Sequence, residues 1–456
     1  MVKMMRKLFS ITIATLSLIL MAGCEAVLSN VPSGSIPSTQ ESSETASHSQ
    51  ALPNEQDSSE APRSITLVTN SGTGKTGGIS TDDGYYYIEK TPQGNGGNIC
   101  YIDHETGANI YLSSQINNTH SDETDESYFD SIIGGVSVFF IDDDLYVFRR
   151  GSPEDSGNFG DAALPELIKM SPSGRNRSIV YQGSASQRYQ EAVAGDTNAI
   201  YSVCVNIDPN SAKEFYELVE ISLDTGVEQV LYETANPLFL LGGYKDSLIC
   251  KEIIRDENLE GLEKYQAQIH QLFELSVKDF KRQTLKEWKQ VDNITQVIAD
   301  GQLICLNSKE RMIEKFNFET GKETQVDASG FIRDDTPNVW NLGVWGRWWV
   351  IYTENMDGYK GEAVQAYNID TDEVHRVSLC YENHEKGVAQ VLPICAAIDD
   401  DFLVIIGERP YPVTYIDQDG DEFKMTLTQD QYAFISIQDY LANRENYREI
   451  AQTPSS

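Results

Sequence analysis

Two short segments combine residue types that bind ions or phosphate in other proteins. Asp417-Gln418-Asp419-Gly420-Asp421 places three carboxylates at alternate positions, the spacing with which a calcium loop begins. No glutamate follows at the distance that an EF-hand requires, and strand-like runs flank the segment at 413–416 and 423–425. We therefore interpret Asp417, Asp419 and Asp421 as a hairpin turn, with calcium binding as the open alternative.

The second segment, Ser71-Gly72-Thr73-Gly74-Lys75-Thr76, resembles the end of a phosphate-binding loop. The first glycine of that motif would fall at position 69, which is threonine. A helix should follow, so that its N-terminal amides face the phosphate, but Gly77-Gly78 and a strand pattern follow instead. The sequence argues against a nucleotide site.

Other catalytic or metal-binding patterns are missing from the chain. There is no G-x-S-x-G elbow and no pair of histidines with H-E-x-x-H spacing. The histidines are His48, His104, His120, His270, His375 and His384. We name no catalytic residue, no cofactor and no metal ligand, although carboxylates distant in so acidic a sequence can still converge on one face.

Tryptophan and cysteine each allow two interpretations. Four of the five tryptophans, Trp340, Trp345, Trp348 and Trp349, lie together, where they could stack on sugar rings or pack inside the fold. We favour packing. Most cysteines after Cys24 lie singly in apolar runs, which indicates buried thiols. Cys380 and Cys395 are the one pair that we would test for a disulfide.

The chain is strongly acidic, with a formal net charge of −35. This charge disfavours nucleic acid and anionic lipid surfaces as partners, and it leaves cations, neutral glycans and basic proteins open. Acidity also keeps an exported protein soluble. We expect the acidic inserts 122–126 and 256–263 to be solvated loops, with contacts to a partner as the alternative.

The N-terminus has the pattern of a signal peptide. Lys3, Arg6 and Lys7 precede an uncharged stretch too short to span a bilayer comfortably. The ending Leu20-Met21-Ala22-Gly23-Cys24 resembles the bacterial lipobox, although Met21 stands where leucine is usual. That resemblance implies cleavage after residue 23, acylation of Cys24 and attachment to the cell membrane by lipid, with palmitate among the acyl chains, on its extracytoplasmic side.

Residues 25–63 have the composition of a tether. They contain ten serines, four prolines and no aromatic residue, so they cannot bury enough apolar surface to fold. As a random coil they would span about 35 Å. We therefore divide the chain into a signal peptide (1–23), a lipidated cysteine with a disordered tether (24–63), a folded body (64–450) and a tail (451–456).

The body contains a repeat that recurs seven times. Its first part is an apolar strand, a tight acidic or glycine turn and a second apolar strand. The turns fall near positions 83, 143, 196, 246, 300, 346 and 400. The second part is an alternating strand with a further turn, as in Cys100–Gly107, Leu218–Gly226 and Lys315–Gly321, and a short strand after it. Two hairpins per unit predict seven four-stranded antiparallel blades, an all-β propeller.

Ring closure is predicted from the ends of the body. The last unit has no clear fourth strand after residue 440, whereas Ile65–Thr69 is a strand without a unit. We expect this N-terminal strand to complete the last blade and to close the ring.

The Ile-Asp-x-x-Thr-Gly turn of the second part, as in Ile102–Gly107, resembles repeats of quinoprotein-like propellers and of bacterial lipoprotein propellers. The resemblance covers most of 64–440 and rests on short motifs, so it implies a fold more than an activity. We expect a protein that is not an enzyme and that binds or scaffolds an unknown protein or glycan. The alternatives are a glycan-active enzyme with convergent carboxylates in the funnel, and a quinoprotein dehydrogenase.

Overall fold

The computed structural model places the larger part of the body and none of the first 63 residues. The described residues are 64–69, 77–91, 95–114, 120, 124–207, 213–330, 332, 338–354, 364–383, 388–416 and 422–451.

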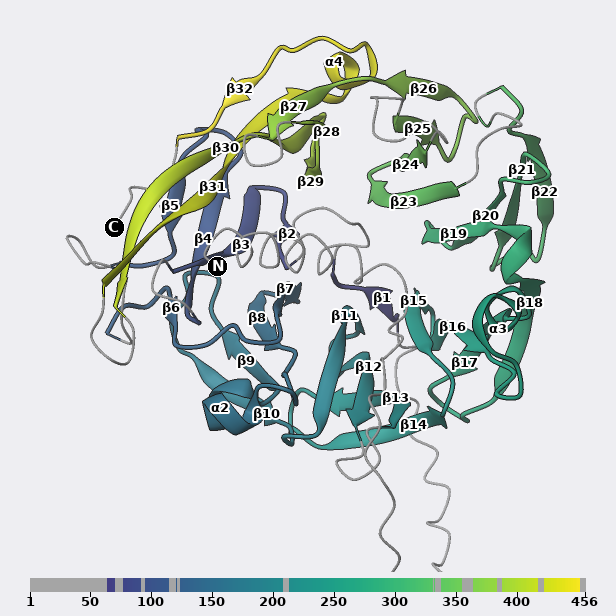
Figure 1. Ribbon diagram of the computed structural model, residues 1–456, viewed down its shortest axis with the longest axis horizontal. Helices are drawn as coiled ribbons and strands as arrows, with labels where there is room; N and C mark the ends of the chain where they lie inside the picture. The colour runs from purple at the N-terminus through teal and green to yellow at the C-terminus, as the bar shows by residue number, and fades with distance from the viewer. Residues whose placement is uncertain are drawn as a thin grey trace, which may run out of the picture. The chain divides into compact units, whose positions relative to one another are not determined.

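Seven antiparallel sheets of four main strands form a β-propeller, which confirms the predicted fold class (Figure 1). From the inside outward, the first three blades are β2 (Ile79–Ser80), β3 (Gly84–Lys90), β4 (Gly97–Asp103) and β5 (Asn109–Tyr111); β7 (Val136–Ile141), β8 (Asp144–Arg149), β9 (Glu166–Met170) and β10 (Ser178–Gln182); and β11 (Gln187–Gly195), β12 (Ala199–Ile207), β13 (Glu214–Ser222) and β14 (Glu228–Thr234). A short strand, β6 (Tyr128–Phe129), also pairs with β4.

The remaining four blades repeat the same order. They are β15 (Leu238–Tyr244), β16 (Ser247–Ile254), β17 (Ile269–Ser276) and β18 (Arg282–Lys289); β19 (Ile294–Ala299), β20 (Gln302–Asn307), β21 (Met312–Asn317) and β22 (Glu323–Asp327); β23 (Asn338–Trp345), β24 (Trp348–Glu354), β25 (Val364–Asn368) and β26 (Val374–Val377); and β29 (Ile394–Ile398), β30 (Asp401–Ile416), β31 (Glu422–Ser436) and β32 (Arg448–Glu449).

The recurrent turn between third and fourth strands has a local chemical cause. In blade 1 the Asp103 carboxylate accepts hydrogen bonds from the backbone N–H and the hydroxyl of Thr106, at 2.7 and 2.5 Å. Gly107 follows with φ +67°, a conformation that costs glycine little. Asn317 and Thr320 form the same bonds in blade 5, both at 2.8 Å. The sequence motif therefore encodes a hairpin turn.

The hydrophobic core is divided among the junctions between blades. Each of seven clusters of buried residues draws on two neighbouring blades, as where Trp348 of blade 6 packs with Phe402 of blade 7. Trp345, Trp348 and Trp349 are buried in such clusters, as the packing interpretation expects, whereas Trp340 is 37% exposed. Burial between blades explains why strands apolar on both faces recur along the sequence.

The predicted closure of the ring is wrong. The N-terminal strand β1 (Thr66–Leu67) pairs with β11, the innermost strand of blade 3, and lies inside the ring beside β15 (Figure 1). Ile65 is 1% exposed, and its backbone fills the space where Gly243 lacks a side chain. The fourth strand of blade 7 is β32, so no strand from the N-terminal part is needed there.

Blades 7 and 1 therefore meet without sharing a strand. Side chains of both pack together, among them Tyr85 and Phe434. The Arg448 guanidinium, within β32, donates to the His104 carbonyl of blade 1 at 2.7 Å, and beyond β32 the Ala451 N–H donates to the Gly107 carbonyl at 3.1 Å. The C-terminal segment thus bridges the seam.

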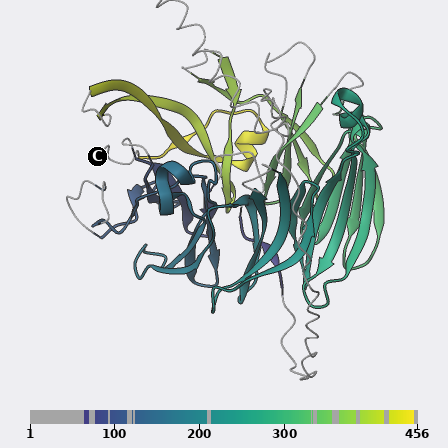
Figure 2. The same ribbon diagram turned by 60° about the horizontal axis from the view of Figure 1, so that its bottom comes forward.

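The two ends of the blades differ. One, here called the turn end, carries the turns from first to second strands and from third to fourth; the helix α4 (Ile437–Leu441) is its largest addition. The other, here called the loop end, carries the longer connections (Figure 2). These contain α2 (Ser156–Phe159), η1 (Gly160–Ala163), α3 (Gly261–Gln266), η2 (Gln290–Asp292), and the hairpin of β27 (Cys380–Asn383) and β28 (Val388–Val391).

The β30–β31 ribbon is the longest extension of a blade. These strands pair from Asp401–Ser436 to Ile416–Glu422, whereas the inner strand β29 reaches only Val404. Among the described residues, no helix is long and apolar enough to cross a membrane.

Candidate functional site

Three successive blades present an arginine at the loop end. Arg150 directly follows β8 of blade 2, and Arg255 directly follows β16 of blade 4. Arg188 is the second residue of β11 in blade 3. We call Arg150, Arg188 and Arg255 the arginine cluster. Second strands run toward the loop end and first strands start from it, so the propeller topology brings these positions to one end.

Arg188 is held by carboxylates. One guanidinium nitrogen donates to Glu214 at 3.3 Å, and another lies 3.6 Å from Glu154. Tyr216 donates its hydroxyl proton to the second oxygen of Glu214 at 2.9 Å. Burial and the Glu214 charge raise the pKa of Tyr216, while the charges of Arg255 and Arg188 oppose that rise, so both arginines act on this phenol.

Arg150 has a looser environment. Among the described residues its ion-pair partner is Glu191, with 3.8 Å between guanidinium nitrogen and oxygen, beyond hydrogen-bond range. The Arg150 side chain is 20% exposed, and its Nε is buried and has no hydrogen-bond partner in the part of the chain that the structure describes. Burial lowers the pKa of Arg150, against the opposing effect of Glu191, and the Arg188 charge lowers it further.

Gly135 leaves room for the Arg150 side chain. A Cβ on Gly135 would lie 2.0 Å from a terminal guanidinium nitrogen of Arg150, and Gly135 has φ +89°. A larger residue there would strain the backbone and require the end of the Arg150 side chain to shift. Glu191, beside it, has its pKa raised by burial, with the Arg150 charge acting in the opposite direction.

Arg255 completes the cluster without an ion pair among the described residues. Its Nε is buried and has no hydrogen-bond partner in that part of the chain. Guanidinium groups offer five donors in a planar fork that matches carboxylate, sulfate and phosphate. Each of these arginines offers donors that suit an oxyanion, while Glu154, Glu191 and Glu214 place carboxylates beside Arg150 and Arg188.

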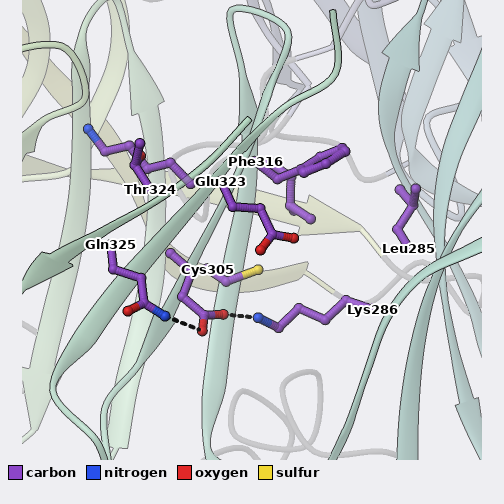
Figure 3. A pocket seen from close by; sticks show the side chains of 10 residues that line it. Leu285, Lys286, Cys305, Phe316, Glu323, Thr324 and Gln325 are labelled. Carbon is purple, nitrogen blue, oxygen red and sulfur yellow. Dashed lines mark hydrogen bonds and ion pairs between the residues drawn. The ribbon is translucent and has the colours of Figure 1, made fainter. Parts of the chain in front are cut away.

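A groove between blades 4 and 5 is a second concave feature (Figure 3). The space between its walls, which includes solvent at its open side, is about 550 Å³, and the lining residues include Lys286, Cys305, Glu314, Glu323 and Gln325. Glu314 binds the Lys286 ammonium with one oxygen and lies 3.5 Å from the Gln325 amide with the other. Burial raises the pKa of Cys305 to about 11, so this thiol is protonated at neutral pH. Lys286, Glu314 and Gln325 therefore already have hydrogen-bond partners within the groove.

Several sequence-based candidates lie outside the described residues. They are Cys24, the 71–76 segment and Asp417, Asp419 and Asp421. The strands on either side of 417–421 pair as a hairpin, with Ile416 opposite Glu422. A hairpin turn at 417–421 requires the strands on either side of it to pair in this way.

Cysteine and histidine candidates do not form sites. Cys380 is exposed, Cys395 is buried, and the two are not bridged. Among the described residues, no three histidine, cysteine, aspartate or glutamate side chains are grouped to hold a metal ion. His48 and His384 lie outside that part.

The first acidic insert is not simply a solvated loop. Asp125 is 3% exposed, and it accepts hydrogen bonds from Ser127 and Ser113 and contacts His120 Nδ1 at 2.8 Å. The second insert, with α3, is exposed as expected.

Sequence reasoning missed the arginine cluster. Its members are separated by 38 and 67 residues, so no local motif contains them. One signal was available, because Arg149-Arg150 is a pair of cations at the end of an apolar strand in a chain of net charge −35.

Comparison with known proteins finds no matching family model and no curated relative. Solved structures do resemble the chain. They include an oligogalacturonate lyase from Vibrio parahaemolyticus (11% identity, 80% of this chain and 91% of that chain, TM-score 0.45), the β-propeller domain of the Trilobed protease from Pyrococcus furiosus (9%, 85% and 98%, 0.45) and the acylaminoacyl peptidase of Pyrococcus horikoshii (11%, 81% and 57%, 0.45). Identities this low assign neither a family nor an activity.

These structures correct one expectation. The sequence led us to expect a protein that is not an enzyme, yet the chains that this fold resembles include a lyase and peptidases.

Proposed function

We propose that this chain is a propeller tethered by lipid to the extracytoplasmic side of the cell membrane, and that it binds its ligand at the loop end. The course of β1 carries the proposal. Thr66 pairs with Gly195, the last residue of β11 before the turn end, and the Ile65 N–H donates to the Lys245 carbonyl in another turn of that end, at 2.8 Å. The exposed Ser64 therefore lies at the turn end.

This course supports a tether that joins the ring at the turn end. A tether that joins the ring at the turn end would favour orientations with that end nearer the membrane. The loop end, with the arginine cluster, α3 and the β30–β31 ribbon, then faces away from the lipid. Function on rigid scaffolds usually resides in such long connections.

The anchor is tested by replacing its acceptor. In cells fed an alkyne-labelled fatty acid, we expect label on the wild-type chain and its recovery with membranes after a high-salt wash. Cys24→Ser should carry no label and appear in the soluble fraction. A labelled, membrane-bound Cys24→Ser chain would contradict lipid attachment at this residue.

Binding to isolated cell-envelope material tests whether the loop end is the end that contacts the ligand. Glu257→Lys and Glu263→Lys in the exposed 256–263 insert alter the loop end, and Asp279→Lys alters the turn end as a matched change. We expect loop-end changes to alter retention and the turn-end change to leave it as in wild type. The reverse result would contradict the proposed orientation.

A glycan-active enzyme is the second candidate, and one observation favours it. Glu154, Glu191 and Glu214 gather about Arg150 and Arg188, and the raised pKa of Glu191 suits a general acid. Release of reducing ends from envelope polysaccharide by the wild-type chain, lost in Glu191→Gln and kept in Glu287→Gln, would support it. No release by the wild-type chain would count against it.

A further inference from the structure

The β30–β31 ribbon extends beyond the rest of blade 7 and has a free edge along β31 (Figures 1 and 2). β29 pairs with β30 only as far as Val404, and β32 pairs with β31 only at Ala433 and Phe434. Among the described residues, no strand pairs with 422–431 on the side of β31 away from β30. A two-stranded hairpin is at best marginally stable in water, so this part of the ribbon lacks the support that a third strand gives.

Backbone alternation shows which residues of β31 present their hydrogen-bonding groups at this free edge. The Tyr432 carbonyl faces the edge, because it accepts a hydrogen bond from the Ile450 N–H at 3.1 Å. The one irregularity in the pairing lies at Ile406 of β30, so β31 itself alternates regularly toward the tip. Every second residue therefore directs its N–H and C=O to the free edge. These residues are Lys424, Thr426, Thr428 and Asp430.

The prolines of β30 agree with this alternation. Pro410 is paired with Thr428, and Pro412 is paired with Thr426. Because opposite residues direct their backbone groups outward together, both prolines lie where the ladder needs no N–H. The side of β30 away from β31 therefore lacks two donors, and proline is a common device against edge pairing. β31 has no proline in 422–436, so its edge keeps the donors that a further strand needs.

The outward residues of β31 are complementary to themselves in reverse order. When two copies pair antiparallel with residue 427 at the centre, Lys424 lies opposite Asp430 of the second copy, and Thr426 lies opposite Thr428. Symmetry repeats both pairs, and cross-strand pairs of opposite charge or of threonines stabilise antiparallel sheets. Lys424, Thr426 and Thr428 are exposed, and Asp430 is half-buried. A register shifted by two residues in either direction would lose the ion pairs.

We propose that β31 is a dimerisation edge, on which a second copy of this chain pairs antiparallel through residues 424–430, so that two ribbons form one four-stranded sheet. Each opposed pair of outward residues exchanges two backbone hydrogen bonds. The same surface serves both copies, as in most homodimers. The net charge of −35 opposes close approach of two rings. The ribbons extend beyond their blades, however, and charges more than about 8 Å apart are largely screened at physiological ionic strength.

Sedimentation equilibrium of the purified full chain tests self-association, with Cys24→Ser in the parent chain so that no acyl chain contributes. We expect a monomer–dimer equilibrium. Thr426→Pro removes an N–H from the free edge in both copies and should raise the dimer dissociation constant at least about tenfold. Thr426→Ala keeps that N–H and should dimerise more tightly than Thr426→Pro. A parent chain that is monomeric at every concentration, or equal dimerisation by Thr426→Pro, would overturn the proposal.

A charge exchange tests the register. Lys424→Asp and Asp430→Lys each place like charges opposite one another and should weaken dimerisation. A mixture of the two variants restores the ion pairs between unlike chains, so it should form a heterodimer with about the affinity of the parent chain. Melting of each variant shows whether it folds. If two folded variants form no heterodimer, the proposed register is wrong.

A disulfide gives a second measurement that does not depend on the folding of Asp430→Lys. Residue 427 lies opposite itself in a position without ladder hydrogen bonds, where the two backbones are closest. In a chain whose Cys24 and Cys380 are replaced by serine, Leu427→Cys should therefore crosslink two copies on mild oxidation. Lys281→Cys, at an exposed position of the turn end, is the control and should not crosslink. A chain that dimerises without the crosslink at residue 427 would contradict the pairing. None of these measurements uses the lipid anchor or the loop-end ligand, so this proposal and the proposed function can fail separately.

Discussion

At the scale of single residues, burial and a neighbouring positive charge in blade 4 lower the pKa of one histidine, His270. His270 is 9% exposed, its ring stacks on Trp288 at 5.5 Å, and its Nε2 lies 2.5 Å from the Gln290 side-chain oxygen. Burial lowers the pKa of His270 to about 4, and the charge of Lys251 lowers it further. The pKa of Lys251 is itself lowered to about 8 by burial.

His270 should make stability depend on pH. Its folded pKa of about 4 lies below the ordinary value near 6.5, so the unfolded chain takes up the proton first as pH falls. We expect this residue to cost the folded state up to about 3 kcal/mol as pH falls from 6.5 to 4. Denaturant unfolding across this range measures it. His270→Gln should flatten the dependence, while the half-buried control His375→Gln should not. Equal slopes in both would contradict the effect.

At the scale of elements, the position of β1 depends on one glycine. A Cβ at Gly243 would lie within 3.0 Å of the Ile65 side chain and of its carbonyl group. Backbone atoms cannot rotate away, so the strand itself must shift.

Gly243→Ala should therefore loosen β1 and lower the free energy of unfolding, by about 1–3 kcal/mol, the usual cost of overpacking. Hydrogen exchange at the Ile65 and Val68 amides should rise, because both donate to backbone carbonyls across this junction. Gly242→Ala is the matched control, since its Cβ would meet Ile298 at an ordinary 3.7 Å. If the Ile65 and Val68 amides of Gly243→Ala exchange as slowly as those of the wild type, β1 does not pack against residue 243.

Elements were predictable from sequence to the extent that they repeat. The turns at 83–400 and the Asp103 and Asn317 motifs gave the blades, because alternation and turn chemistry are local. The strand that pairs with Ile65–Thr69 is distant in the sequence, so no local pattern identifies it. An apolar strand suits any unpaired edge, and the competing edge strand, Arg448–Glu449, is two exposed residues with no hydrophobic pattern. The arginine cluster escaped notice because only the ring brings Arg150, Arg188 and Arg255 to one end.

At the scale of the whole molecule, the ring has one junction that no continuous chain crosses. Six neighbouring pairs of blades are connected directly along the sequence, whereas blades 7 and 1 depend on side chains and on the segment at 448–451. His104 contributes from blade 1, with Nε2 3.3 Å from Asp401 of blade 7. The seam should be the first junction to open.

Truncation after Asn446 removes β32 and the bond from Ala451 to Gly107. We expect faster hydrogen exchange in β4 and β5 than in β16 and β17, because blade 1 loses its bridge while blade 4 keeps both neighbours. Removal of 452–456 alone is the control and should leave exchange unchanged. Uniform protection after the longer truncation would show that side-chain packing alone holds the seam.

The orientation that supports the proposed function depends on β1 lying inside the ring. Engineered disulfides test this most directly, in a chain whose exposed Cys380 is replaced by serine. Leu67→Cys with Ala194→Cys joins residues that are paired across β1 and β11, and should form a crosslink in full yield on mild oxidation. Leu67→Cys with Glu449→Cys, at the rim of blade 7, should form none. A crosslink to residue 449 and none to residue 194 would place the N-terminal strand on the outside of the last blade and contradict the account.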